Sequence, residues 1–330
     1  MSLDPMPNMQ AVDVQSVADR HAGPIFIVLN PGSGAQDAET ARARIEAVLA
    51  AGGRACEFVA VPDPVRLHAT AAECVRRARA VHGTVVAAGG DGTINAVAHA
   101  VLGSGCPFGV LPMGTFNYFG RTHGIPEDVE AAARVLLEGR VKAVQVGAVN
   151  ERIFLVNASL GLYPKLLEER ESAKRQFGRS RLVAFVSALY TLLRNHRVLR
   201  LWLRCDDAVA SIATPTLFVG NNRLQLEQLG IAEAACVERG QLAAIALRPV
   251  SPAGMLGLAL RGSLGRLGEA DNVLSFPFRE ILLSVAVGRR RPPRIKVATD
   301  GEVMWMRLPL QLRVADRMLP LLCPPDEPAT

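Results

Sequence analysis

The first half of the chain alternates short apolar runs with amphipathic stretches, and this pattern predicts alternating strands and helices. The apolar runs have the length of buried strands and end at Gly, Pro or Asn, whereas the stretches between them have helical spacing. The predicted strands are residues 25–29, 55–61, 84–88 and 108–111, and the predicted helices are residues 37–51, 65–81, 94–102 and 126–138. Alternation of this kind is typical of a parallel, doubly wound α/β sheet.

The second half has a different pattern, with more strands and fewer helices. Apolar runs predict strands at residues 153–157, 198–203, 215–219, 242–247, 280–285, 294–298 and 303–308. Only residues 165–194 and 252–267 have strong helical spacing. This half is therefore predicted to form a β-rich domain.

These patterns divide the chain into three parts. Residues 1–22 contain acids and prolines without a regular pattern, and we expect a mobile tail there. Residues 23–147 should form a Rossmann-like α/β domain, and residues 148–330 the β-rich domain. An arrangement in which the last segment packs back on the first domain is left open.

Three of the predicted strands run into loops that are rich in Gly and in hydroxyl or amide side chains. In an open α/β sheet, ligands bind outside the carboxyl ends of the strands, and a Gly-rich turn before a helix presents unpaired N–H groups to an anion. The glycines would leave room for a close backbone approach and permit positive φ. The candidate residues are Asn30, Pro31, Gly32, Ser33 and Gly34, then Gly89, Gly90, Asp91, Gly92, Thr93 and Asn95, and finally Gly114 and Thr115. We therefore expect a phosphate-rich ligand, although a single such loop would equally be a tight turn with Asp91 or Thr93 capping the helix.

Charge and composition narrow the class of partner. The net charge of +6 and a pI near 9.3 favour an anionic partner, such as a nucleotide, an acidic lipid surface or a nucleic acid. The six cysteines are scattered without metal-ligand spacing, which indicates buried thiols in a reducing compartment. No signal peptide is visible, and the longest helix-like apolar run, residues 182–193, is shorter than the roughly 20 residues that cross a bilayer. We expect a cytoplasmic protein.

Four motifs in this order resemble one family. NPGSG at residues 30–34, GGDGT at 89–93, PMGTFN at 112–117 and DGE at 300–302 are similar to the motifs of the diacylglycerol kinase catalytic domain family. That family includes bacterial soluble lipid kinases and is related to sphingosine and ceramide kinases, and the resemblance runs from about residue 24 to 322. GGDGT also occurs in NAD kinases and, more distantly, in phosphofructokinases. The resemblance implies ATP and Mg²⁺ as cofactors and an antiparallel sandwich as the second domain.

The resemblance also implies roles for individual residues. Asp91 would bind Mg²⁺ that carries nucleotide oxygens, because Mg²⁺ prefers one or two carboxylates together with phosphates. Asp300 would be the general base on the acceptor hydroxyl, and Glu302 would orient it. Without the resemblance, Asp300 and Gly301 predict a hairpin turn between strands 294–298 and 303–308.

Three positions depart from the family pattern and bear on activity. Ala96 and Gln145 stand where relatives usually carry acids, and Arg239 replaces an acid that would ligate an accessory metal ion. The first hypothesis is an ATP-dependent lipid kinase that phosphorylates diacylglycerol or a similar lipid. The alternatives are an NAD kinase-like enzyme with a soluble substrate, or a family member that binds lipid or nucleotide without turnover.

The partners expected for a lipid kinase are a lipid substrate and an anionic membrane, with no nucleic acid. The basic residues of two segments, 174–181 and 289–294, are candidate membrane contacts. The protein would be peripheral to the inner face of the membrane and act in phospholipid biosynthesis. The sequence leaves the oligomeric state open, a homodimer included.

Overall fold

The structure is a computed structural model that describes residues 23–30, 35–61, 63–164, 167, 198–205, 208–285 and 294–325. The chain forms two compact units. Unit 1 comprises residues 1–146 and 315–330, and unit 2 comprises residues 147–314. The chain therefore leaves unit 1 once and returns to it, at a boundary one residue before the one that the sequence pattern suggests.

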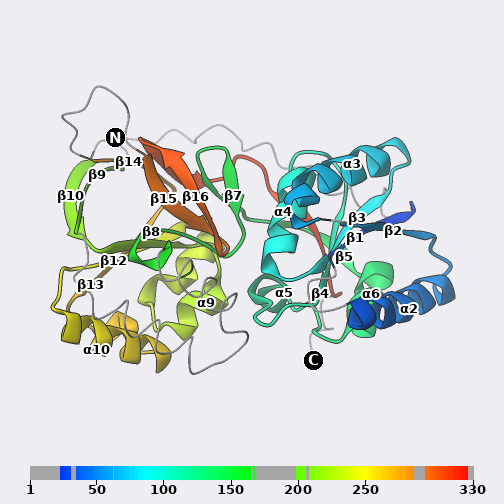
Figure 1. Cartoon of the computed structure of the whole chain (residues 1–330), viewed down its shortest axis with the longest axis horizontal. Helices are drawn as coiled ribbons and strands as arrows, with labels where there is room; N and C mark the ends of the chain where they lie inside the picture. The colour runs from blue at the N-terminus through cyan, green and yellow to red at the C-terminus, as the bar shows by residue number, and fades with distance from the viewer. Residues whose placement is uncertain are drawn as a thin grey trace, which may run out of the picture. The chain divides into compact units, whose positions relative to one another are not determined.

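Unit 1 is built on a six-stranded sheet with helices on both faces (Figure 1). Its strands, in sheet order, are β2 (Cys56–Ala60), β1 (Ile25–Leu29), β3 (Thr84–Gly89), β4 (Phe108–Pro112), β18 (Leu319–Cys323) and β5 (Arg140–Val144). All neighbours are parallel except β5, which runs antiparallel to β18. On one face α3 (Leu67–Ala80) packs beside α4 (Asp91–Val101), and on the other α2 (Ala35–Ala51) packs beside α6 (Val129–Glu138). The predicted doubly wound sheet is confirmed.

The apolar runs of unit 1 form strands because both sheet faces are covered. Every residue of β1, β3, β4 and β18 is buried, as expected for strands between two helical layers. From β1 the chain moves to β2 on one side, and then to β3 on the other side of β1. The sheet order therefore reverses next to β1, and the loops after β1 and β3 emerge together at its carboxyl edge.

Unit 2 is a sandwich of two antiparallel sheets, as predicted. One sheet contains β10 (Ala208–Thr214), β9 (Leu199–Cys205), β14 (Glu280–Val285), β17 (Leu310–Val314), β6 (Gly147–Val149) and β7 (Arg152–Phe154). The other contains β13 (Val273–Phe278), β12 (Leu242–Leu247), β11 (Thr216–Gly220), β8 (Asn157–Gly161), β15 (Arg294–Thr299) and β16 (Glu302–Arg307). Buried side chains of both sheets form one apolar cluster, including Leu201 and Leu312 from the first and Leu160 and Val297 from the second. This cluster is the core of unit 2.

Short helices cover the outer face of the second sheet. Residues of α9 (Arg223–Gln228) and of the 3₁₀ segment Ala232–Arg239 pack on β12 through a smaller apolar cluster. The helix predicted at residues 252–267 is observed as α10 (Pro252–Ser263), followed by a 3₁₀ turn at Leu267–Glu269. The predicted tail and the helix predicted at 165–194 fall outside the described residues, apart from isolated positions. Among the described helices, none combines the length and apolar character needed to cross a membrane.

Candidate functional site

Three loops begin at the carboxyl edge of the sheet in unit 1. The strands that precede them, β1, β3 and β4, are direct neighbours. The Asn30 backbone N–H donates to the Ala88 carbonyl at 3.1 Å, and the Met113 N–H donates to the Gly89 carbonyl at 2.9 Å. The residue that follows β1 is therefore bonded to β3, and the third loop is bonded to the last residue of β3.

A side-chain bond joins the first two loops as well. The Asn30 side-chain amide donates to the Thr93 hydroxyl at 2.9 Å, and Thr93 is buried in the first turn of α4. Asn95 is also buried, two residues further along the same helix. Thr115, by contrast, is exposed at the end of the third loop. The remaining residues of the first loop, Pro31, Gly32, Ser33 and Gly34, lie outside the described residues.

Glycine is required in these loops by space and not by backbone angle. A Cβ on Gly114 would lie 2.8 Å from the Gly90 Cα and 3.0 Å from Asn117 Oδ1, which real Cβ atoms do not tolerate. A Cβ on Gly89 would lie 2.8 Å from the Thr93 side chain. Gly90 itself has φ −83°, and Gly89, Gly92 and Gly114 have no positive φ either. For the described glycines of the second and third loops the expectation of positive φ was wrong, because Gly89 and Gly114 are needed to make room for Thr93 and for the Gly90 backbone.

Asp91 links the second loop to the third. It lies in the first turn of α4, whose N-cap residue is Gly90 without a side-chain cap. Its carboxylate accepts backbone N–H groups of Asn117, Tyr118 and Phe119, at the start of α5 (Tyr118–Thr122). The alternative that Asp91 or Thr93 caps its own helix is therefore wrong, because Asp91 caps the neighbouring helix instead.

The Asp91 carboxylate is buried, and its electrostatics reflect this. Burial raises the pKa of the carboxyl above its ordinary value, and the three N–H groups partly oppose that shift. One of its oxygens, Oδ1, is buried and has no hydrogen-bond partner among the described residues. A buried, unpaired carboxylate oxygen costs free energy, so this position has the chemistry of a ligand for a cation.

Asn117 is a site residue that the sequence reasoning did not select. It has φ +48°, a left-handed conformation that Asn adopts more readily than most residues. Its side chain accepts from the Gly114 N–H at 3.0 Å and donates to the Gly114 carbonyl at 2.9 Å. Asn117 thereby holds the third loop in the conformation that packs against Gly90. The signal for it in the sequence was the Asn at the end of PMGTFN.

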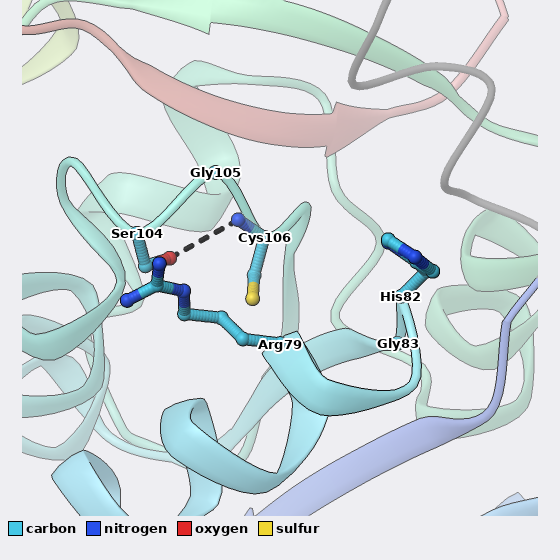
Figure 2. A pocket seen from close by; sticks show the side chains of 6 residues that line it. All are labelled: Arg79, His82, Gly83, Ser104, Gly105 and Cys106. Carbon is cyan, nitrogen blue, oxygen red and sulfur yellow. Dashed lines mark hydrogen bonds between the residues drawn. The ribbon is translucent and has the colours of Figure 1, made fainter.

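The pocket shown in Figure 2 lies at the opposite edge of the sheet. It has a volume of about 220 Å³ and is lined by Arg79, His82, Gly83, Ser104, Gly105 and Cys106. Gly83 and Cys106 stand just before β3 and β4, so the pocket adjoins the amino ends of these strands. None of the residues predicted from the motifs lines it, and it is separate from the three loops.

Asp300 lies in unit 2, in the turn between β15 and β16. Asp300 and Gly301 have φ +47° and +90°, and Thr299 pairs with Glu302 across the hairpin. Two consecutive positive φ angles in a two-residue loop are typical of a type I′ turn, which favours Asp-Gly. The hairpin turn expected from these residues alone is therefore present.

The Asp300 carboxylate is also a clamp on a second segment. Its Oδ2 accepts the Leu155 N–H at 2.7 Å, and its Oδ1 accepts the N–H groups of Val156 and Asn157 at 2.9 Å each. These three residues connect β7 to β8 and are buried. Nearby on β8, Asn157 Oδ1 and Ser159 Oγ are buried without a partner among the described residues. Sequence reasoning missed these two polar residues, because an Asn and a Ser within an apolar strand were the only signal.

The remaining predicted residues make fewer contacts. Glu302 begins β16, directly after the turn that contains Asp300, and is exposed. Arg239 is exposed at the end of its 3₁₀ segment. Among the described residues, no cluster of three or more His, Cys, Asp or Glu could hold a metal ion. Asp91 thus fits Mg²⁺ only as a single protein carboxylate, which is a usual arrangement when phosphate oxygens and water complete the shell.

Comparison with known proteins relates the motifs to a family. Residues 24–149 match the model of the diacylglycerol kinase catalytic domain. Over 82 residues the chain is 40% identical to a protein named "Probable lipid kinase YegS-like" from Cronobacter sakazakii, a match that covers 24% of this chain and 27% of that protein. Over 99 residues it is 38% identical to a diacylglycerol kinase from Staphylococcus aureus (strain JH9), covering 28% of this chain and 31% of the relative. The matches thus span about a third of these relatives or less.

A solved structure matches nearly the whole chain. The crystal structure of a diacylglycerol kinase from Bacillus anthracis (strain Sterne) superposes with a TM-score of 0.65. The match covers 92% of this chain and 97% of that one, at 19% sequence identity. At this identity the likeness establishes the two-part fold, and the activity has to be argued from the site.

Proposed function

We propose, on the premise that residues 24–149 belong to the diacylglycerol kinase catalytic domain family, that this protein is an ATP-dependent lipid kinase. It would phosphorylate a hydroxyl of diacylglycerol or of a similar lipid. The observation that carries the proposal is the packing of the second and third loops, in which Gly90 and Gly114 touch and Asp91 bridges to α5. This arrangement leaves backbone N–H groups and small side chains at the carboxyl edge of the sheet, where phosphates bind.

The three loops would hold the phosphates of ATP. Asn30, Thr93 and Thr115 supply polar side chains, and the N-terminus of α4 supplies N–H donors. Asp91 would hold Mg²⁺, which neutralises charge on the transferred group when it is bound. The unpaired Oδ1 of Asp91 supports this assignment, because a cation would compensate a buried anionic oxygen.

Asp300 would accept the proton of the acceptor hydroxyl. As the terminal phosphoryl group passes from ATP to the hydroxyl oxygen, the bond to the bridging oxygen of ADP breaks, and the hydroxyl proton goes to the carboxylate. The three N–H groups that hold Asp300 fix its orientation, which a general base requires. We assign Glu302 a secondary role beside it, on its place in the same hairpin.

Such an enzyme would act at an anionic membrane surface. The net charge of +6 supports this. The cationic segment 174–181 and residues 289–293 lie outside the described residues, whereas Arg294 is described and begins β15. A peripheral position on the inner membrane face and a role in phospholipid biosynthesis complete the proposal.

One observation favours a second candidate, a protein that binds nucleotide or lipid without turnover. Asp91 is the only carboxylate in the three loop motifs, and Ala96 and Gln145 add none. An enzyme that relies on two protein carboxylates for its metal would be inactive with this set. Turnover, and not binding, separates the two candidates.

The test is incubation of the full chain with γ-labelled ATP, Mg²⁺ and a panel of acceptors. The panel contains diacylglycerol, ceramide and a total bacterial lipid extract, with NAD as a soluble acceptor. We expect label in a lipid, and its loss by at least about 100-fold in Asp91→Asn and in Asp300→Asn assayed under conditions where each is folded. Label only in NAD would replace the lipid kinase by an NAD kinase-like enzyme, and ATP binding without any labelled acceptor would support the non-catalytic candidate.

A further inference from the structure

The helix α10 in unit 2 exposes a stripe of leucines. Leu256, Leu260 and Leu264 are spaced four residues apart, at α10 and its C-cap, and have 40%, 61% and 66% of their surface exposed. The opposite side of the helix, with Met255 and Leu258, is buried. Residues four apart lie on one face of a helix, so these three leucines form a continuous strip, called here the α10 leucine face.

The α10 leucine face lacks the charges of an ordinary solvated surface. The helix contains no Asp or Glu, and Arg261 is its single charged residue. A Cβ placed on Gly257 or on Gly262 would meet nothing within 4 Å, so none of the described residues covers the helix there. A surface helix normally buries its apolar stripe and exposes polar residues, whereas α10 is apolar on its exposed side too.

The dimensions of this face suit a lipid surface. A helix of 12 residues is about 18 Å long, too short to cross a bilayer but long enough to lie in its interfacial layer. One helical strip of three leucines falls well short of the roughly 800 Å² that each partner buries in a standard protein interface. A second copy of the chain would therefore need additional surface to form a stable dimer here.

Cations flank the face at its ends. Arg248 precedes α10, Arg261 lies in its last turn and Arg266 follows it, and all three are exposed. Arg266 pairs with Glu269 at 2.8 Å, so the positive charge beside the face comes from Arg248 and Arg261. Leucines between arginines complement an anionic bilayer, in which apolar side chains enter the acyl boundary and cations meet the headgroups.

We propose that the α10 leucine face is a docking site for an anionic bilayer, with Leu256, Leu260 and Leu264 inserted at the headgroup boundary. This rests on the proposed lipid kinase function, which requires a substrate dissolved in a membrane. The site would hold unit 2 at the surface in which the substrate resides.

The first experiment measures binding without catalysis. The full chain is sedimented with vesicles of phosphatidylglycerol and phosphatidylcholine, in the absence of ATP. The test variant combines Leu256→Gln, Leu260→Gln and Leu264→Gln, because Gln is a good helix former of similar length. The control variant combines Val65→Gln and Val209→Gln, two exposed apolar residues away from α10.

We expect the triple variant to bind vesicles at least about 10-fold more weakly, because interfacial binding scales with buried apolar area. The control should bind as the wild type does, and circular dichroism should show both variants folded. Wild-type binding should persist in part at about 0.5 M salt, where surface charges are screened. Equal binding by the wild type and the triple variant would overturn the proposal. A wild-type dimer that the triple variant dissociates, with vesicle binding unchanged, would overturn it in favour of a contact between two copies.

The second experiment separates this proposal from the proposed function. Turnover is measured on diacylglycerol in vesicles and on a short-chain diacylglycerol dispersed as monomers. The triple variant should lose turnover at least about 10-fold on vesicles and keep it on the monomeric substrate. A wild type that binds vesicles through α10 but phosphorylates no lipid would leave the docking site in place and remove the lipid kinase.

Discussion

Replacing Asp300 should destabilise unit 2, because one carboxylate holds three buried backbone N–H groups. In Asp300→Asn the side-chain oxygen can still accept from Val156 and Asn157, but the amide NH₂ then faces the Leu155 N–H, donor against donor. Hydrogen bonds to a charged group stabilise by about 1.5–3 kcal/mol each and neutral ones by about 1 kcal/mol. Losing one charged bond and weakening two others should lower the free energy of unfolding by about 3 kcal/mol.

A graded comparison makes this estimate sharper. Asp300→Ala removes all three acceptor contacts and places a Cβ residue without a polar side chain at φ +47°, which costs a further 1–2 kcal/mol or so. We therefore expect Ala to destabilise more than Asn, by about 5 kcal/mol or more in total. Glu302→Gln is the matched control, since Glu302 is exposed two residues away and surface substitutions stay within about 0.5 kcal/mol.

The chain supplies its own probe for the measurement. Its two tryptophans, Trp202 in β9 and Trp305 in β16, both belong to unit 2. Urea unfolding followed by tryptophan fluorescence therefore reports unit 2, and the shift of the midpoint gives the change in stability. A midpoint for Asp300→Asn within error of the Glu302→Gln midpoint would refute the clamp. If turnover of the folded Asp300→Asn protein stayed near that of the wild type, Asp300 would be a structural residue and not the base.

Three further predictions concern unit 1. Gly90→Ala should keep the wild-type melting temperature, since its Cβ would meet only the Gly114 Cα at 3.5 Å, but it should lose ATP affinity in calorimetry. Gly114→Ala, whose Cβ would lie 2.8 Å from the Gly90 Cα, should lower the melting temperature and the ATP affinity. Unchanged ATP affinity in the two variants would mean that these loops bind no phosphate. Asp91→Asn should be at least as stable as the wild type at pH 8, because the raised pKa of Asp91 means that the folded state disfavours the ionised carboxyl. The stability difference should shrink as the pH falls toward 3.8, where the carboxyl is protonated. Calorimetric melting measures it, and a variant that melts at a lower temperature than the wild type at pH 8 would contradict the prediction. Burial lowers the pKa of His123 to about 4, so between pH 6.5 and 4 the unfolded chain binds a proton that the folded chain does not. The free energy of unfolding should therefore fall over this pH range, and His123→Gln should reduce that fall. An unchanged slope in the variant would mean that other groups cause the pH dependence.

The strands that could be predicted are those whose burial follows from an apolar run in their own sequence. β1, β3 and β4 are uninterrupted apolar runs that end in turn residues, so their positions follow from the sequence. β18 is equally buried, but its neighbours in the sheet are β4 and β5, far earlier in the chain. No local pattern states that the last strand returns to the first sheet, and the sequence left this point open.

In the site, too, features within one loop could be predicted, but contacts between loops could not. The second and third glycine-rich motifs lie together in the structure, but the motifs do not state what each glycine contacts. The expected reasons were space for a close approach to an anion and positive φ, whereas the observed close approach at Gly114 is to the backbone of Gly90 in another loop. The sequence predicts that Asp91 caps its own helix or binds a metal ion, while its observed partners are the backbone N–H groups of residues 117–119. Side-chain partners across loops are a property of the packed sheet, and the sequence does not encode them at short range.

These cross-links have a consequence for binding. Hydrogen bonds from Asn30 to Thr93, from Met113 to Gly89 and from Asn117 to Gly114 cross-link and shape the loops. Such bonds restrict the loop backbones, which would lower the ordering entropy that opposes the binding of an anion. The same rigidity keeps Asp91 desolvated with one oxygen unpaired. A cationic ligand would compensate that buried anionic oxygen, which the neutral amide of an Asn at this position would not do as well.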